Sequence, residues 1–319
     1  MSRGPTICKS NRQEAIALFP TRPVCYRPAN VRRGCRAGLS KGADMRRIMA
    51  SLVACCLVGP WASVQAATPA TMVWQAGQVV SYKIEHTTQA TDSVGESKSE
   101  TKSVMRAVRD WKCTAVDTAG VATLEMSLSS MYQERTTPGG ETLVFDSANP
   151  EKSTPALKEV MQKFLNTTLA VLRVDATGKV VEVKSSTSHA SSYENELPFI
   201  VLLPTAGLEV GQGWDRTFAI TLAPPLGTGE KYDAVQSFVC KSIADGKATL
   251  SLTTALKTTP KAAADAIPLW QMMPEGEVVF DLKAGRLHSA KLGIAKELKG
   301  HQGEGSACKF TSTLVIEKN

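Results

Sequence analysis

Short runs in which apolar and polar residues alternate recur through the chain downstream of residue 67. Three examples are Thr123 to Leu128, Ala248 to Thr253 and Leu314 to Glu317. A period of two places one row of side chains on each face of an extended segment, and this pattern is typical of half-buried antiparallel strands. The sequence therefore predicts a mainly β fold.

One series of landmarks occurs twice in the same order, which indicates an internal duplication. In each copy a glycine and a tryptophan precede a strand, an aromatic residue and a cysteine two positions apart end the next strand, and aspartate–glycine turns follow. The matched segments are Trp74 to Gln78 with Val210 to Trp214, Trp111 to Cys113 with Phe238 to Cys240, Asp117 to Gly120 with Asp245 to Gly246, and Val174 to Val180 with Phe280 to Leu287. We predict two similar antiparallel β units, built as curved sheets or half-barrels.

The domain boundaries follow from this duplication. The first unit is expected over residues 67–192, a connector over 193–208 and the second unit over 209–319. The first unit contains one amphipathic helix at about residues 153–169, with Ser153 as its cap and Pro155 in its first turn. Its apolar face consists of Leu157, Val160, Met161, Phe164, Leu165 and Thr168. Such a helix plugs the open side of a sheet or, alternatively, forms a mobile lid over a cavity.

The segment Met45 to Ala66 has the organisation of a secretory signal peptide. Arg46 and Arg47 provide the positive start, Ile48 to Val58 form an apolar stretch, and Val64 to Ala66 form a small-x-small end. Cleavage is expected between Ala66 and Ala67. The predicted location is periplasmic or secreted.

The segment has two alternative interpretations, a membrane anchor and a lipoprotein signal. A membrane anchor requires about 20 apolar residues, but Pro60 interrupts the run, so we expect no transmembrane span after cleavage. Leu52 to Cys55 matches a lipobox, which would make the protein a lipoprotein anchored at Cys55. Apolar residues continue past that cysteine through Trp61, and this favours cleavage after Ala66.

Residues 1–44 are rich in arginine and lack apolar periodicity. This pattern predicts either that the start codon is assigned too early, with Met45 as the true initiator, or that the segment is a disordered extension. Residues 1–66 hold 11 of the 37 basic residues and 2 of the 30 acidic ones. The remainder has 26 basic and 28 acidic residues, so the overall pI of about 9.0 comes from the leading segment. Alternatively, residues 1–44 form a disordered, arginine-rich arm that binds nucleic acid. An export signal follows this segment directly, so we predict no nucleic-acid partner.

Five of the eight cysteines lie before residue 67, leaving Cys113, Cys240 and Cys308. An oxidising compartment favours disulfides, and three cysteines permit three pairings. We favour Cys240 with Cys308, which ties an early strand of the second unit to its last strand. A buried free thiol is the plainer interpretation of each.

Motifs of catalysis and metal binding are absent from the sequence. There is no nucleophile elbow, phosphate loop, zinc-protease helix or CxxC pair, and the four histidines stand at no metal-ligand spacing. The acidic pairs Glu194 with Glu196 and Glu275 with Glu277 have the i, i+2 spacing that two carboxylates on one strand face would need. Solvated charges beside prolines are the interpretation we favour. We predict no metal, no cofactor and no enzymatic activity.

The favoured function is a non-catalytic cell-envelope protein that binds an apolar ligand, such as a lipid or acyl chain, or a protein partner. Methionine and tryptophan side chains adapt to irregular apolar ligands. The candidate ligand-binding residues are Met161, Phe164, Trp270, Met272 and Met273. The alternative is a periplasmic hydrolase that acts on envelope glycans or peptides.

A set of turn and strand-start residues carries a resemblance to known proteins. The order is Asp175, Gly178, Val180 and Val183, then Leu203 and Pro204, then Val210, Gly211 and Trp214. It resembles uncharacterised secreted β-proteins of bacteria, which have no assigned chemistry. At the level of the fold alone, curved sheets with a plugging helix are similar to periplasmic lipid-carrier and lipoprotein-chaperone folds.

Overall fold

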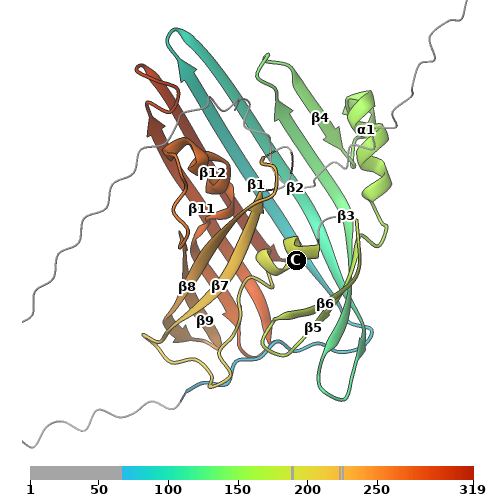
Figure 1. Ribbon diagram of the computed structural model, residues 1–319. Coiled ribbons are helices and arrows are strands. Elements are labelled where there is room, and N and C mark those ends of the chain that lie inside the picture. Colours follow the sequence, from blue (N-terminus) through green and yellow to red (C-terminus); the bar gives the residue numbers. More distant parts are fainter. Residues whose placement is uncertain (1–66, 188–189, 223, 225) are drawn as a thin grey trace, which may run out of the picture. The chain divides into compact units, whose positions relative to one another are not determined.

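A single antiparallel sheet of 12 strands dominates the computed structural model, which describes residues 67–187, 190–222, 224 and 226–319 (Figure 1). The strand order is β6-β5-β3-β2-β1-β12-β11-β10-β9-β8-β7, and β4 pairs with β3 beside that path. The sheet is not closed, so β6 and β7 are its two edge strands. The prediction of a mainly β, antiparallel fold is confirmed.

The elements of the first half differ in length from those of the second. The first half contains β1 (Val79–Val94), β2 (Ser97–Val116), β3 (Ala122–Thr136), β4 (Thr142–Asp146), η1 (Pro150–Lys152), α1 (Pro155–Met161), η2 (Gln162–Phe164), β5 (Ala170–Val174) and β6 (Val180–Ser186). After η3 (Ala190–Asn195), the second half contains β7 (Gly213–Leu222), β8 (Glu230–Ala244), β9 (Lys247–Leu256), η4 (Ala263–Met272), β10 (Glu275–Asp281), β11 (Arg286–Lys299) and β12 (Ser306–Lys318).

Pairing of β1 with β12 joins the two halves into one sheet. Their ladder runs from Tyr82 opposite Lys318 to Val94 opposite Ser306. The sequence predicted two units, and each half does form its own run of neighbouring strands. The last strand returns to the first one, however, and the sheet is therefore continuous across the centre of the fold.

The two cysteines of the repeated landmarks occupy the same local geometry. The amide of Gly77 donates to the carbonyl of Cys113 at 2.8 Å, and the amide of Gly211 donates to the carbonyl of Cys240 at 2.8 Å. A register shift follows each cysteine in its pairing with the next strand. This similarity agrees with the expected duplication, which stays a prediction.

The aspartate–glycine turns form as the sequence indicates. The Asp175 carboxylate accepts hydrogen bonds from the amides of Thr177 at 2.9 Å and Lys179 at 3.1 Å. Gly178 has φ of +90°, a conformation that an L side chain rarely adopts. Its missing Cβ also matters, because a Cβ there would lie 2.7 Å from the Met72 side chain. Local chemistry therefore closes the β5–β6 hairpin.

The expected helix of the first half is shorter than predicted. It begins at Pro155, its N-cap is Thr154 rather than Ser153, and η2 continues it only to Phe164. The hydroxyl of Ser153 instead accepts a hydrogen bond from the amide of Asp146 at the end of β4. Beyond Phe164 the chain becomes extended, and Asn166 has φ of +55°. A left-handed residue cannot continue a right-handed helix, and the predicted end at residue 169 was wrong.

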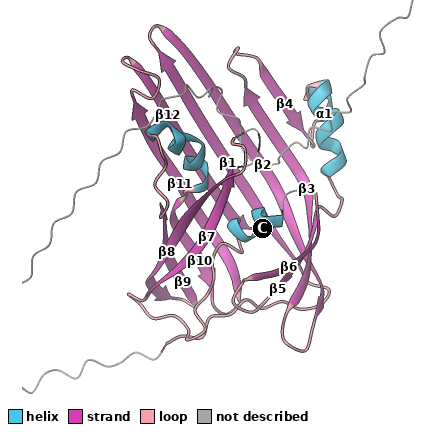
Figure 2. Cartoon of the chain, in the orientation of Figure 1, coloured by secondary structure: helices cyan, strands magenta, loops and turns pink. Residues whose placement is uncertain are grey.

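The helical segment η4 was not predicted. Figure 2 shows it as a cyan coil beside β11 and β12, and it also contacts β7. Because β7 is an edge strand and β12 lies five strands away in the sheet order, one short helix can touch both only if the sheet curls around it. The curved sheet that the sequence predicted is therefore present in this half.

The predicted connector is part of the hydrophobic core. Its buried apolar residues are Tyr193, Leu197, Phe199, Ile200, Val201, Leu203 and Leu208. The ring of Phe199 meets that of Trp111 edge to face, with centroids 4.9 Å apart. These residues share the main core cluster with Phe238 and Leu252 of the second half. The segment between the halves therefore holds them together.

The predicted signal segment Met45 to Ala66, with Cys55, lies outside the described residues, which begin at Ala67. In the part of the chain that is described, none of the helices combines the length and the apolar character needed to cross a bilayer.

Candidate functional site

Two inward-facing arginines, one from each half, bind the segment between the halves. Arg109 of β2 forms an ion pair with Glu196, with Nη1 and Oε2 3.1 Å apart. Arg216 of β7 donates to the Asn195 side chain at 2.6 Å and to the Ile200 carbonyl at 3.2 Å. A buried arginine requires such partners, because removing its charge from water is costly.

Burial dominates the electrostatics of these groups. It raises the pKa of the Glu196 carboxyl, while the nearby Arg109 charge acts in the opposite direction. Burial likewise lowers the pKa of Arg216, and the charge of Glu194 opposes that shift. The guanidinium of Arg216 also lies 5.3 Å from the centroid of the Phe218 ring, which adds a cation–π contact.

Polar residues continue across the sheet from Arg216. Gln236 of β8 lies opposite Arg216, and Thr254 of β9 lies opposite Gln236. The Thr254 hydroxyl donates to the carbonyl of Pro274 at 2.8 Å. We call these inward-facing groups and their partners the polar belt; its members are Arg109, Asn195, Glu196, Arg216, Gln236 and Thr254.

The polar belt separates apolar clusters in the second half. On β8, Phe238 belongs to the main core cluster, whereas Ala234, on the other side of Gln236, packs with Leu269 of η4. The cluster around Leu269 also contains Ile220 and Leu222, and we call it the β7 cluster. A further cluster joins Trp270 of η4 to Ile294, Cys308 and Phe310, and we call it the β12 cluster.

The structure brings three of the five predicted ligand-binding residues together. Trp270 is in the β12 cluster, Met272 packs against the β7 cluster, and Met273 contacts both. The other two, Met161 and Phe164, pack into the main core cluster at α1 and η2. Since Met161 is 1% exposed, its place is that of an ordinary core residue.

The inner face next to the β12 cluster is polar. His86 of β1 lies 2.9 Å from the hydroxyl of Ser312, measured from Nε2 to Oγ. Burial lowers the pKa of His86. Thr88, Thr101 and Ser103 are also buried. This stretch of β12, β1 and β2 thus presents hydroxyl groups beside the apolar residues under η4.

A depression opens at the free edge beside the β7 cluster. Its volume is about 320 Å³, and its lining consists of Thr217, Phe218, Asp233 and Lys257. Phe218 lies on the same strand as Arg216 and packs against the β7 cluster. The depression therefore reaches apolar residues that adjoin the polar belt.

The three described cysteines are free and buried. The Cys240–Cys308 disulfide that we favoured is not formed, because β8 and β12 are separated by three strands and neighbouring strands lie about 4.8 Å apart. Burial, with a contribution from the charge of Asp92, raises the pKa of the Cys308 thiol to about 11. That thiol is therefore protonated at neutral pH and lacks the thiolate that nucleophilic catalysis requires.

The acidic pairs from the sequence have different environments. Glu196 is not the solvated charge that we favoured, because it is buried against Arg109. Glu275 and Glu277 are exposed on β10. Within residues 67–319, excluding the undescribed positions, no three His, Cys, Asp or Glu side chains gather closely enough to hold a metal ion.

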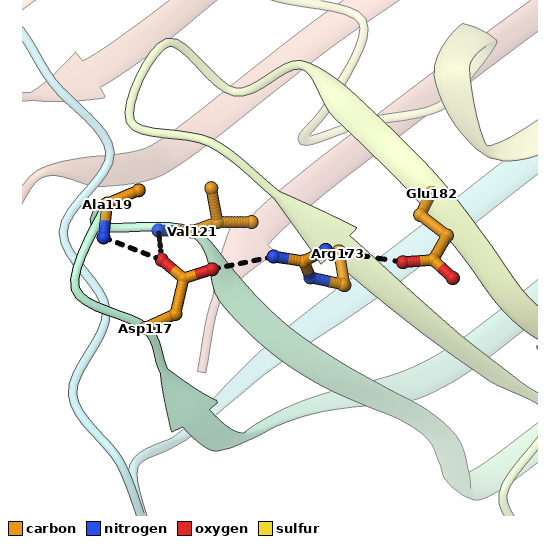
Figure 3. Close-up of polar contacts among 5 residues, drawn as sticks. All are labelled: Asp117, Ala119, Val121, Arg173 and Glu182. Atoms are coloured by element: carbon orange, nitrogen blue, oxygen red, sulfur yellow. Dashed lines mark hydrogen bonds and ion pairs between the residues drawn. The ribbon is translucent and has the colours of Figure 1, made fainter.

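An exposed ion network braces the end of the first half (Figure 3). Arg173 of β5 contacts Asp117 of the β2–β3 turn at 2.6 Å and Glu182 of β6 at 3.4 Å. The Asp117 carboxylate also accepts from the amides of Val121 at 3.0 Å and Ala119 at 2.9 Å. These bonds, that of Val121 first, lower the pKa of Asp117. These contacts fix the conformation of the β2–β3 turn and attach it to β5. The role of this network is therefore structural.

No protein-family model matches the chain, and no curated protein is similar to it. Among solved structures, one titled for lipid–protein interactions in lipovitellin is 13% identical with a TM-score of 0.43, over 77% of this chain and 25% of that one. DynF from the dynemicin biosynthesis pathway of Micromonospora chersina is 7% identical with a TM-score of 0.19, over 81% and 92%. A DUF1329 family protein from Desulfovibrio piger is 11% identical with a TM-score of 0.13, over 75% and 83%. The chain spans about a quarter of the lipovitellin chain, and none of these similarities identifies a function.

Proposed function

We propose that this protein is a non-catalytic, exported β-protein that binds an apolar chain, such as the acyl chain of a lipid, between η4 and the curved sheet. The observation that carries this proposal is the position of Met273. Its side chain packs against both the β7 cluster and the β12 cluster, and it remains only partly buried. A ligand that inserts there would contact both clusters at once.

The structure of η4 supports its role as a displaceable cover. It is a 3₁₀ segment of 10 residues with Pro268 inside it. Runs of this kind are normally only 3 or 4 residues long because their hydrogen bonds have poor geometry, and proline removes one donor. Apolar contacts of Leu269 and Trp270 therefore hold η4 in place, and a bound acyl chain can exchange for part of them.

The side chains under η4 suit an irregular apolar ligand. Met272 and Met273 are unbranched and polarisable, so they can repack around chains of different shape. Trp270 supplies a large apolar surface. The main core, on the other side of the polar belt, is closed by the connector and offers no comparable partly exposed methionines among the described residues.

Export is the second part of the proposal. It rests on the sequence of Met45 to Ala66, which predicts a cleaved signal and a mature chain that begins at Ala67. Export would place the protein in the cell envelope or outside the cell. Amphiphiles that carry acyl chains would be available to it there as ligands. An envelope protein partner remains the other ligand that the sequence suggests.

The ligand part is tested by titrating the purified protein with a single-chain amphiphile that carries a fluorescent label. The Met272→Gln and Met273→Gln variants should each weaken binding by about fivefold to thirtyfold, because each places an amide in an apolar site. Val181→Gln is the matched control, since Val181 is 45% exposed on β6, and it should bind as the wild type does. Equal affinity in all four proteins, or no binding by the wild type, would overturn the proposal.

A further inference from the structure

Arg216 carries a buried charge that is bound only by neutral groups. The residue is 8% exposed, and its guanidinium donates to the side-chain oxygen of Asn195 at 2.6 Å and to the carbonyl of Ile200 at 3.2 Å. Arg109, the other inward-facing arginine of the polar belt, is instead paired with the carboxylate of Glu196 at 3.1 Å. One of the two buried arginines is therefore neutralised by the protein, and the other is not.

The nearby charge of Glu194 does not replace an ion pair. Glu194 acts on the charge of Arg216, but it is exposed to solvent and forms no ion pair with Arg216 in the described part of the chain. Water and salt screen an exposed charge, whereas the guanidinium has been removed from water. The bonds to Asn195 and Ile200 use two of its five N–H groups and leave its charge uncancelled. The interior beside Arg216 can therefore accept one negative charge.

Arg216 lies at the edge of the apolar site under η4. Its guanidinium is 5.3 Å from the centroid of the Phe218 ring. Phe218 packs against the β7 cluster, as Met273 does. Directly after Met273, the carbonyl of Pro274 accepts a hydrogen bond from Thr254 of the polar belt at 2.8 Å. An apolar chain that contacts Met273 and Phe218 would therefore place its end within reach of the Arg216 guanidinium.

Gln236 supplies a second polar group at the same place. It lies opposite Arg216 in the β7–β8 ladder and is 1% exposed, and its Oε1 atom has no hydrogen-bond partner among the described residues. The amide also carries two N–H donors. Side chains directly opposite each other on neighbouring strands have Cβ atoms about 4.5 to 5.5 Å apart. An anion bound by Arg216 would therefore also be within reach of the Gln236 NH₂ group.

We propose that the site under η4 selects single-chain amphiphiles with an anionic end, such as a carboxylate, which forms an ion pair with Arg216 and accepts a hydrogen bond from the amide of Gln236. This inference rests on the proposed function, because it assigns the polar end of the same ligand. A carboxylate can accept two parallel N–H bonds from a guanidinium and supplies the missing charge. An alcohol of the same chain length supplies neither.

The test compares dodecanoate with 1-dodecanol at pH 8, each displacing a fluorescent single-chain amphiphile from the protein. The wild type should bind dodecanoate at least about tenfold more tightly than the alcohol. Arg216→Gln should bind dodecanoate about tenfold more weakly than the wild type does, and its affinity for the alcohol should change by less than about threefold. Gln236→Leu, which replaces the amide by an apolar side chain, should weaken binding of dodecanoate by about threefold to tenfold.

Arg106→Gln is the matched control. It removes the same charge from a side chain of β2 that is 57% exposed, and it should bind both compounds as the wild type does. Thermal unfolding of each variant shows whether it folds. If Arg216→Gln does not fold, Gln236→Leu decides, and an unchanged affinity of that variant for dodecanoate overturns the inference.

The outcomes separate this inference from the proposed function. If neither compound binds the wild type, the proposed function and the inference both fail. If the wild type binds the alcohol as tightly as dodecanoate, or if Arg216→Gln lowers both affinities by the same factor, the apolar site stands and the inference alone is overturned. In that case Arg216 serves only to hold the connector.

Discussion

Arg109 of β2 and Glu196 of the connector form an ion pair of 3.1 Å in which the two side chains are 7% and 18% exposed. The pair ties the first half of the sheet to the segment that leads into the second half. Removing one partner leaves an unpaired charge in the interior. Arg109→Met should therefore destabilise the protein by roughly 3 to 5 kcal/mol, measured by denaturant unfolding.

The double variant Arg109→Met with Glu196→Leu is the control for this effect. It removes both charges, and its loss of stability should be clearly smaller than that of Arg109→Met alone. If the single and double variants lose the same stability, the ion pair does not hold the connector in place.

The connector should behave as core when its apolar residues are truncated. Phe199 is 1% exposed and meets Trp111 edge to face. Phe199→Ala should lower the free energy of unfolding by about 3 to 5 kcal/mol. Val210→Ala, at a position that is 57% exposed, should change it by less than about 0.5 kcal/mol. A small effect at Phe199 would mean that the segment is a peripheral linker after all.

Stability should fall on mild acidification because of His86. Burial lowers its pKa below the ordinary value of 6.5, so the unfolded chain takes up a proton more readily than the folded one. The stability that neutral His86 provides is complete above pH 6.5 and is lost as the pH falls through the lower folded pKa, by at most about 1.4 kcal/mol per pH unit. Unfolding of the wild type and of His86→Gln at pH 7.5 and 5.5 measures this. The variant should lose less stability between the two pH values; equal losses would exclude His86 as the cause.

The thiols of Cys113, Cys240 and Cys308 should all react with an alkylating reagent after unfolding without reductant. They are buried and unpaired in the fold. Peptide mapping by mass spectrometry identifies the labelled positions, and a reduced sample provides the full-labelling control. Only one labelled thiol of the three would show that a pair had formed.

The exported chain should begin at Ala67. N-terminal sequencing of the protein recovered from the producing cells tests this directly. A start at Cys55 would instead identify a lipoprotein, and an intact Met1 would contradict export by this signal.

Features that depend on local sequence could be predicted. The alternating run Thr123 to Leu128 lies in β3 with Leu124, Met126 and Leu128 buried. Asp175 and Gly178 close the β5–β6 hairpin as expected. These features follow from a few neighbouring residues. The register of β1 on β12 depends on residues more than 200 positions apart, and no local pattern specifies it.

The polar belt was missed although a signal was present. Arg109 stands in the apolar row of β2, with Ala107 before it and Trp111 after it, at a position where alternation places side chains inward. Arg216 interrupts the inward row of β7 in the same way. A charge in an inward row indicates a buried partner. The partners lie on the connector, whose burial comes from tertiary packing that the sequence alone does not reveal.

Native mass spectrometry of the gently purified protein tests the central claim most directly. We expect a fraction of the molecules to carry a bound single-chain amphiphile that is lost from Met273→Gln and retained by Val181→Gln. A wild-type protein that carries no amphiphile, and takes up none when mixed with 1-dodecanol or with dodecanoate, would contradict the account.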